Sequence, residues 1–192
     1  MSPDLELALS VAGAADAITM SRFRTGLPIE TKADLTPVTE ADRAVEAEIR
    51  RLLADARPDD AVLGEEEGVA GTGARRWIVD PIDGTRNYAR GIPVWATLVA
   101  LEVDGEVRVG VASAPALGRR WWAERGLGAF ANGERIRVST ISSVEEAVLS
   151  FALERERRQL HAAPGMRAAS ATSGRTCSSP REPSTERLTQ SA

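Results

Sequence analysis

An apolar run in the middle of the chain ends in two aspartates that could bind a metal ion. The stretch WIVDPIDGT, residues 77–85, places Asp80 and Asp83 three residues apart, directly before Gly84 and Thr85. Two carboxylates and a loop carbonyl are hard oxygen ligands of the kind that Mg²⁺ prefers. Gly84 lets the backbone approach a ligand closely, and a helical turn that begins at Thr85 could seat a phosphate. The alternative is an ordinary aspartate turn that caps a short helix.

A second acidic segment precedes this stretch. Glu65 and Glu66 directly follow the short apolar run 61–64. Taken alone, they could form a solvated acidic loop. Two strands that each end in carboxylates, however, could bring four or five acids to one edge of a sheet. Such a cluster repels itself unless cations occupy it.

Two residues nearer the N-terminus have both a structural and a functional interpretation. Asp42, in PVTEAD, stands three residues after Thr39, which is the spacing of a capping box at a helix start. Asp42 could cap this helix and also touch a metal-bound water. Lys32 is the only lysine of the chain. It is either an ordinary surface residue or a charge that balances the acids and steers a phosphate.

The hydrophobic pattern predicts a mixed α/β (α+β) fold in which two helices pack on one face of a mixed, largely antiparallel sheet. The first helix begins at Ser2 and Pro3, and the second begins near Thr39 and ends before Pro58. Asp104-Gly105 and Asn132-Gly133 predict tight turns between strands. We expect a loop over 65–74 and a helical turn plus a last strand over 142–153. The expected strands are 61–64, 76–80, 94–103, 106–113, 119–125 and 129–139.

Composition excludes several classes of protein. The net charge of -4 and the pI near 5.2 argue against a general nucleic-acid binder, which shows a basic face. No apolar run approaches the length of a membrane span, and the first residues do not resemble a secretory signal. Cys177 is the only cysteine, so neither a disulfide framework nor a cysteine metal site is expected. We therefore expect a cytoplasmic protein without nucleic-acid or membrane partners.

The character of the chain changes after residue 153. Residues 154–192 hold seven arginines and four glutamates but only three large apolar residues, Leu160, Met166 and Leu188. Such a segment cannot bury enough surface to offset the entropy of ordering it. We predict a folded domain over 1–153 and a disordered tail over 154–192.

The three acidic motifs together resemble one protein family. PVTEAD, GEE and DPIDGT occur in the order and spacing of the inositol monophosphatase family of Mg²⁺-dependent phosphatases, and the resemblance runs from about residue 3 to 153. It implies the N-terminal half of a layered α-β-α-β-α fold and two or three Mg²⁺ ions. It also implies a small phosphorylated substrate, attack by a metal-activated water, and a possible homodimer.

The resemblance also implies a role for each residue. Metal ligands are expected at Glu65, Asp80, the backbone carbonyl of Ile82, and Asp83. Thr85, with Asp42 behind it, and Glu65 are expected to activate and orient the attacking water. Contacts to the phosphate are expected from Asp83, Gly84 and Thr85. Glu66 and Lys32 are expected to lie behind these groups.

Within this family, DPIDGTRNYARGIPVWATLVAL followed by SAPALGRRWWAERGLGAF looks most like the histidinol-phosphatases of actinobacterial type. This likeness implies hydrolysis of L-histidinol phosphate in histidine biosynthesis. Three alternatives stay open. The first is an inositol-1-monophosphatase or other sugar monophosphatase. The second is a haloacid-dehalogenase-type phosphatase, although its motif is D-x-D-G-T and here the spacing is D-x-x-D-G-T. The third is a non-catalytic remnant or a binding subunit.

The family pattern continues beyond what this chain contains. It has a second half with a WD-x-A-A motif, whose aspartate completes the metal site, and no Trp-Asp pair occurs here. We expect that the chain is truncated by a frameshift or a wrong gene boundary. Truncation implies weak or no turnover and exposed apolar surface.

Overall fold

The computed structural model describes residues 1–26, 28–31, 37–143 and 146–148. The chain divides into two compact units, Met1–Val138 and Ser139–Ala192. All the described helices and strands lie in the first unit.

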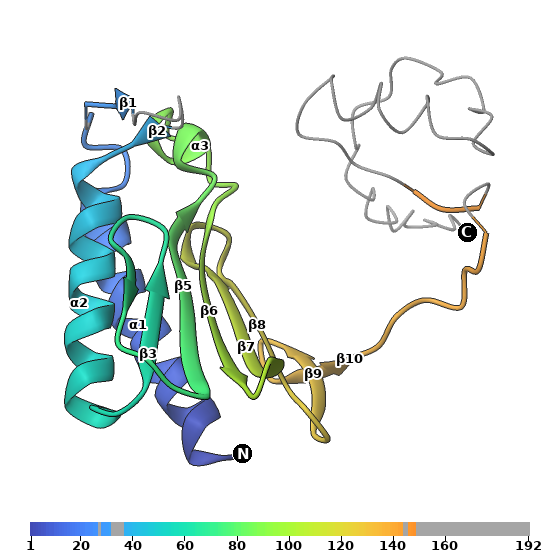
Figure 1. The fold of residues 1–192 in the computed structure, drawn as a ribbon. Coiled ribbons are helices and arrows are strands. Elements are labelled where there is room, and N and C mark those ends of the chain that lie inside the picture. The colour runs from blue at the N-terminus through green and yellow to red at the C-terminus, as the bar shows by residue number, and fades with distance from the viewer. Residues whose placement is uncertain (27, 32–36, 144–145, 149–192) are drawn as a thin grey trace, which may run out of the picture. The chain divides into compact units, whose positions relative to one another are not determined.

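An eight-stranded sheet forms the centre of the first unit (Figure 1). Its strands are β3 (Ala61–Gly64), β4 (Gly68–Ala70), β5 (Arg75–Asp83), β6 (Ala96–Val103), β7 (Glu106–Ala114), β8 (Arg119–Glu124), β9 (Gly128–Ala131) and β10 (Glu134–Ile136). The spatial order is β10-β9-β8-β7-β6-β5-β3-β4. β3 and β5 are parallel, and every other neighbouring pair in this sheet is antiparallel. A separate two-stranded sheet joins β1 (Glu30–Thr31) to β2 (Pro37–Val38).

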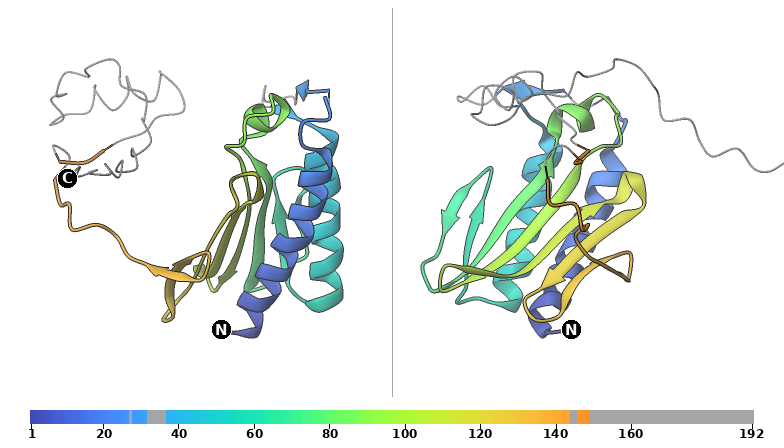
Figure 2. Two further views of the ribbon diagram at one scale, coloured as in Figure 1. Left: turned by 180° about the vertical axis from the view of Figure 1, so that it is seen from behind. Right: turned by 90° about the vertical axis from the view of Figure 1, so that its right-hand side faces the viewer.

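Two long helices, α1 (Pro3–Arg22) and α2 (Glu40–Ala56), cover one face of this sheet (Figure 2). α1 packs on β6 and β7, α2 packs on β5, and the two helices pack on each other. Their starts are set locally. The Ser2 hydroxyl accepts a hydrogen bond from the Leu5 amide at 3.1 Å, and Thr39 caps α2. Two short elements, α3 (Thr85–Ala89) and the 3₁₀ helix η1 (Pro115–Leu117), complete the fold.

The core lies between the helices and the sheet. Successive side chains of a strand point to opposite faces, so alternate residues of β5 and β6 meet the helices. Trp77, Val79, Val99 and Leu101 are buried in this way against the apolar faces of α1 and α2. The helix residues of this apolar cluster are Leu5, Ala8, Val11, Ala12 and Ala15 of α1 and Val45, Ile49 and Leu53 of α2. Burial of this apolar surface is the main force that holds α2 against β5.

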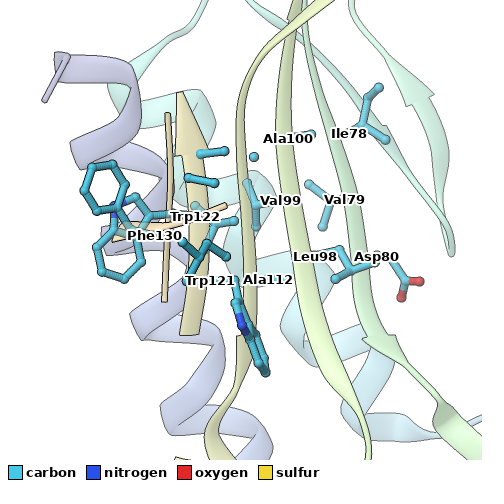
Figure 3. Close-up of a pocket in the computed structure, with 15 residues that line it drawn as sticks. Ile78, Val79, Asp80, Leu98, Val99, Ala100, Ala112, Trp121, Trp122 and Phe130 are labelled. Atoms are coloured by element: carbon cyan, nitrogen blue, oxygen red, sulfur yellow. The ribbon is translucent and has the colours of Figure 1, made fainter. Parts of the chain in front are cut away.

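No described helix covers the opposite face of the sheet. An apolar hollow of about 520 Å³ lies there. Ile78, Leu98, Trp121 and Phe130 are among its lining residues (Figure 3). Figure 3 also shows Asp80 farther along β5 than Ile78, beside Leu98. One carboxylate of the acidic motif therefore lies at the border of an apolar surface.

The predicted α+β architecture, with two helices on one face of a mixed sheet, is confirmed. The two predicted tight turns are confirmed as well. Both residues of each turn have positive φ, with 52° and 78° at Asp104-Gly105 and 47° and 91° at Asn132-Gly133. Among the helices that the structure describes, none is long and apolar enough to cross a membrane.

Two local predictions were wrong. The segment predicted as a loop over 65–74 contains β4, which pairs antiparallel with β3. The strand predicted to end at Asp80 continues to Asp83 through a register shift in its pairing with β6. Most of 142–153 lies outside the described residues, as does all of the predicted tail.

Removing a core side chain should destabilise the chain far more than removing an exposed one of the same type. Leu53 is 1% exposed between α2 and the sheet, whereas Leu117 is 47% exposed. We expect Leu53→Ala to lower the free energy of unfolding by about 2–5 kcal/mol, because it removes buried methyl groups and leaves a cavity. Leu117→Ala, measured by the same urea titration, should change it by less than about 1 kcal/mol. Equal losses would contradict the placement of the core.

Candidate active site

The parallel pairing of β3 with β5 places Glu65 beside Asp80. Gly64 stands opposite Val79, and the Glu65 amide donates a hydrogen bond to the Val79 carbonyl at 3.2 Å. The pairing of β3 with β5 ends at Gly64 and Val79, so the next residues, Glu65 and Asp80, lie side by side there, while β5 itself continues to Asp83. Two carboxylates from distant parts of the sequence meet at this edge.

Asp80 carries the most strongly perturbed carboxyl group of this edge. Burial, the negative charge of Glu65 and its side-chain hydrogen bond, and the charges of Asp83 and Asp42 together raise the pKa of Asp80 to about 8. Its Oδ1 atom is buried without a hydrogen-bond partner. A buried, unpaired carboxylate oxygen surrounded by like charges is stabilised either by a proton or by a cation.

A bulge in β5 separates Asp80 from Asp83. Asp80 pairs with Leu98 and Asp83 with Ala96, so three steps along β5 match two along β6. Such an extra residue bends a strand and changes the direction of its side chains. Asp83 is exposed as a result.

Both carbonyl groups inside the bulge lie within hydrogen-bond distance of a threonine hydroxyl. The Pro81 carbonyl accepts one from Thr97 Oγ1 at 2.8 Å. The Ile82 carbonyl lies 3.1 Å from Thr85 Oγ1. A carbonyl oxygen has two lone pairs, so one remains on Ile82 for the metal contact that the resemblance implies.

Asp42 both caps α2 and contacts Thr85. Its Oδ2 atom accepts hydrogen bonds from the Thr39 amide at 2.8 Å and the Thr39 hydroxyl at 2.6 Å, which confirms the capping box. Its Oδ1 atom lies 3.1 Å from Thr85 Oγ1. Burial raises the pKa of Asp42, although these hydrogen bonds act in the opposite direction. The structural and the functional interpretation of Asp42 are therefore compatible.

Gly84 connects the bulge to α3 in a conformation that favours glycine. Its φ is 91° and its ψ is 35°, and an added Cβ atom would lie 3.1 Å from the Val94 carbonyl oxygen. Thr85 then begins α3, as the sequence predicted. A side chain at position 84 would push this turn away from the loop that carries Val94.

Aromatic side chains that the sequence analysis did not single out anchor α3. Tyr88 is 2% exposed, and its hydroxyl donates a hydrogen bond to the Thr19 carbonyl of α1 at 2.8 Å. The rings of Tyr88 and Trp95 meet edge to face with centroids 5.0 Å apart, and Phe23 packs on both. Tyr88 and Trp95, both within RNYARGIPVW, are the residues from which this cluster could have been predicted.

Glu66, which the sequence predicted to lie behind the metal ligands, is in the acidic turn between β3 and β4. The Glu66 amide donates a hydrogen bond to Glu46 Oε2 at 2.7 Å, and Glu46 is fully buried. Sequence reasoning missed Glu46, because a glutamate in the middle of a helix is usually exposed. Lys32 lies outside the described residues.

A sequence model of the inositol monophosphatase family matches residues 1–182. The chain belongs to the inositol monophosphatase family. This confirms the resemblance inferred from PVTEAD, GEE and DPIDGT. The match reaches beyond residue 153, where the sequence predicted the end of the domain.

Individual relatives agree with this assignment. The chain is 54% identical over 158 residues to a histidinol-phosphatase of Streptomyces coelicolor, a match that covers 77% of this chain and 59% of that protein. It is 56% identical over 155 residues to a histidinol-phosphatase of Mycobacterium tuberculosis, covering 77% of this chain and 60% of that protein. The solved structure of an IMPase of Thermotoga maritima is 38% identical, with a TM-score of 0.71, and the match covers 76% of this chain and 57% of that one. The chain thus spans about 60% of the length of these curated relatives.

Members of this family are metal-dependent phosphatases. Within the described part of the chain, no three Asp, Glu, His or Cys side chains are grouped as a ready-made metal site. The donor chemistry nevertheless fits a hard cation. The Asp80 Oδ1 atom is buried without a hydrogen-bond partner. The side chains of Glu65 and Asp83, whose charges raise the Asp80 pKa, are exposed.

The raised pKa of Asp80 predicts a stability that falls as pH rises. The pKa of Asp80 is about 8 in the folded chain, against an ordinary value of 3.8. Between these two pH values, the folded chain keeps a proton that the unfolded chain has released. The free energy of unfolding, measured by urea titration in a chelator, should therefore decrease from about pH 4 to about pH 8. Asp80→Asn should make this slope shallower. The slope that remains is due to Asp42, whose pKa is also raised. An unchanged slope in Asp80→Asn would contradict the assignment.

Proposed function

We propose that this chain forms the metal-binding part of a Mg²⁺-dependent phosphomonoesterase that acts on L-histidinol phosphate. The observation that carries the proposal is the acidic edge formed by Glu65 and Asp80, where burial and like charge raise the Asp80 pKa to about 8. The preference for histidinol phosphate follows from relatives of that name at 54% and 56% identity.

Four groups at this edge would hold the cations: the carboxylates of Glu65, Asp80 and Asp83, and the Ile82 carbonyl. Mg²⁺ bound there would lower the pKa of a coordinated water and neutralise charge that develops on the phosphate. The charges of Glu65 and Asp83 both act on Asp80, so the Asp80 carboxylate would hold the cations together with both of them. The bulge in β5 supports this role, since it turns Asp83 outward while Asp80 stays half-buried.

Thr85 and Asp42 would position the attacking water. The Thr85 hydroxyl carries one hydrogen, and it lies 3.1 Å from both Asp42 Oδ1 and the Ile82 carbonyl. When that hydrogen points to the Asp42 carboxylate, the Thr85 oxygen can accept a hydrogen bond from water. Asp42 in turn is fixed by two hydrogen bonds from Thr39. This pair could therefore orient a water molecule and take up its proton.

Gly84 and Thr85 would hold the phosphate. The first amides of a helix have no partner within that helix, so those at the start of α3 can face an anion. The positive φ of Gly84, 91°, lets the chain turn from β5 directly into α3 at this point. Asp83 adjoins the turn and would link the phosphate to the cations.

An inositol-1-monophosphatase or other sugar monophosphatase remains the alternative substrate class, because a structurally similar relative of Thermotoga maritima is an IMPase. A non-catalytic remnant remains the alternative outside enzymes. Family membership removes the reason for a phospho-aspartate mechanism. The homodimer and the cytoplasmic location stay predictions.

Phosphate release from the purified chain tests the function. We expect release from L-histidinol phosphate in Mg²⁺ that is faster than release from inositol-1-phosphate and abolished by a chelator. Asp83→Asn should reduce release to background.

A matched control separates the site from general effects of lost charge. Asp59 is an exposed aspartate in the turn between α2 and β3, and Asp59→Asn should leave release unchanged. Thr85→Val should lower the rate by about a hundredfold, the smaller end of what a positioned proton acceptor contributes. Equal rates in Asp59→Asn and Asp83→Asn would refute the proposed site. A preference for inositol-1-phosphate would favour the alternative substrate class.

A further inference from the structure

We propose that Glu46, with Arg50 as its counterion, is a positioning residue that holds Glu65 in place for cation binding. The inference rests on the proposed function, but its structural basis is independent of any substrate. Glu46 lies on α2, one helical turn after Asp42, and is fully buried.

The Glu46 carboxylate binds the backbone of the acidic turn. Its Oε2 atom accepts a hydrogen bond from the Glu66 amide at 2.7 Å, and its Oε1 atom accepts one from the Glu67 amide at 3.0 Å. A carboxylate is the side chain that can accept from both amides at once, since it carries acceptors only. Bonds of this charge-assisted kind are stronger than neutral ones.

Arg50 neutralises Glu46 and holds the other end of the turn. Its Nε and Nη2 atoms lie 2.9 Å and 2.8 Å from Glu46 Oε1. Nη2 also donates to the Gly68 carbonyl at 2.5 Å. The pair therefore contacts the turn on both sides of Glu67. Without Arg50, a buried carboxylate beneath three consecutive glutamates would face strong like-charge repulsion.

The strand before the turn is shaped to admit this carboxylate. An added Cβ atom on Gly64 would lie 2.0 Å from Glu46 Oε1 and 2.7 Å from Arg50 Nη2. Position 64 is therefore glycine because Glu46 occupies the space of a side chain. Glu65 then has its own amide fixed on Val79 and the next two amides fixed on Glu46.

The hydrogen bonds to Glu46 fix the backbone from which Glu65 reaches the proposed cation site. Three consecutive backbone amides around Glu65 are bound, so its carboxylate starts from a fixed point beside Asp80. Groups that orient a metal ligand typically contribute a factor of 10 to 100 in metal affinity. Glu46 therefore acts through Glu65 and touches neither substrate nor cation.

The test uses Glu46→Gln in the whole chain, because glutamine keeps the size of the side chain but replaces one acceptor by a donor. We expect amide hydrogen exchange at residues 66 and 67 to accelerate, and Mn²⁺ affinity, measured by calorimetry, to fall by about tenfold or more. Glu48→Gln is the matched control, since Glu48 lies on the same helix and, among the described residues, forms its side-chain hydrogen bonds with exposed Arg51. It should change neither quantity.

The outcomes are separable. Faster exchange at unchanged Mn²⁺ affinity would overturn the positioning role. Unchanged exchange would show that Glu46 does not fix the backbone of the acidic turn. If the wild-type chain binds no Mn²⁺, the proposed function fails, while the exchange experiment still decides whether Glu46 fixes the turn.

A second variant covers the case in which Glu46→Gln does not fold. Gly64→Ala displaces the Glu46 carboxylate without altering any charge, and it should lower Mn²⁺ affinity as well. Gly110→Ala is the control, since its added Cβ atom would meet no atom within 4 Å, and it should leave Mn²⁺ affinity unchanged. Equal losses in the two variants would overturn the proposal.

Discussion

Repulsion between carboxylates at the shared end of two parallel strands is the constraint on which the rest of this site depends. β3 and β5 are the one parallel pair among the described strands of the large sheet, and this pairing brings Glu65 beside Asp80. Burial and, after it, the charge of Glu65 raise the pKa of Asp80. A fold that places acids here therefore needs groups that hold them against their mutual repulsion and a ligand that neutralises them.

α2 supplies most of the groups that hold the site. Asp42 in its first turn contacts Thr85, and Glu46 one turn later binds the acidic turn after β3. The same helix is fixed on the sheet by Ile49 and Leu53, which are buried in the core. The packing that stabilises the fold thus also sets the distance between the two halves of the acidic edge. A change in how α2 sits on β5 would disturb Thr85 and Glu65 together.

Features encoded by neighbouring residues could be predicted from the sequence. The caps at Ser2 and Thr39 and the turns at Asp104-Gly105 and Asn132-Gly133 depend on a few adjacent residues, and all are present. The two helices and the mixed sheet followed from periodicity. The motif residues Glu65 and Asp80 were identified from their positions after apolar runs, and the strand pairing that joins them was a reasonable hypothesis.

Features that depend on distant contacts could not be predicted in this way. Proline is unusual inside a central strand, so the sequence predicted that β5 ends before Pro81. Thr97, sixteen residues away, satisfies the Pro81 carbonyl and lets the strand continue through a bulge. Glu46 carries no local sign of burial, because the amides that it accepts from lie twenty and twenty-one residues away. The role of Lys32 stays a prediction.

The titration of the Asp80 carboxyl group, followed by ¹³C NMR in the presence and absence of Mg²⁺, tests the central claim most directly. Without a divalent cation, the Asp80 resonance should titrate with a pKa near 8. With saturating Mg²⁺ the apparent pKa should fall well below this value, because the cation competes with the proton for the same oxygen atoms. A titration near the ordinary aspartate value in both conditions would contradict the account, since Asp80 would then lack the electrostatic environment on which the proposed cation site depends.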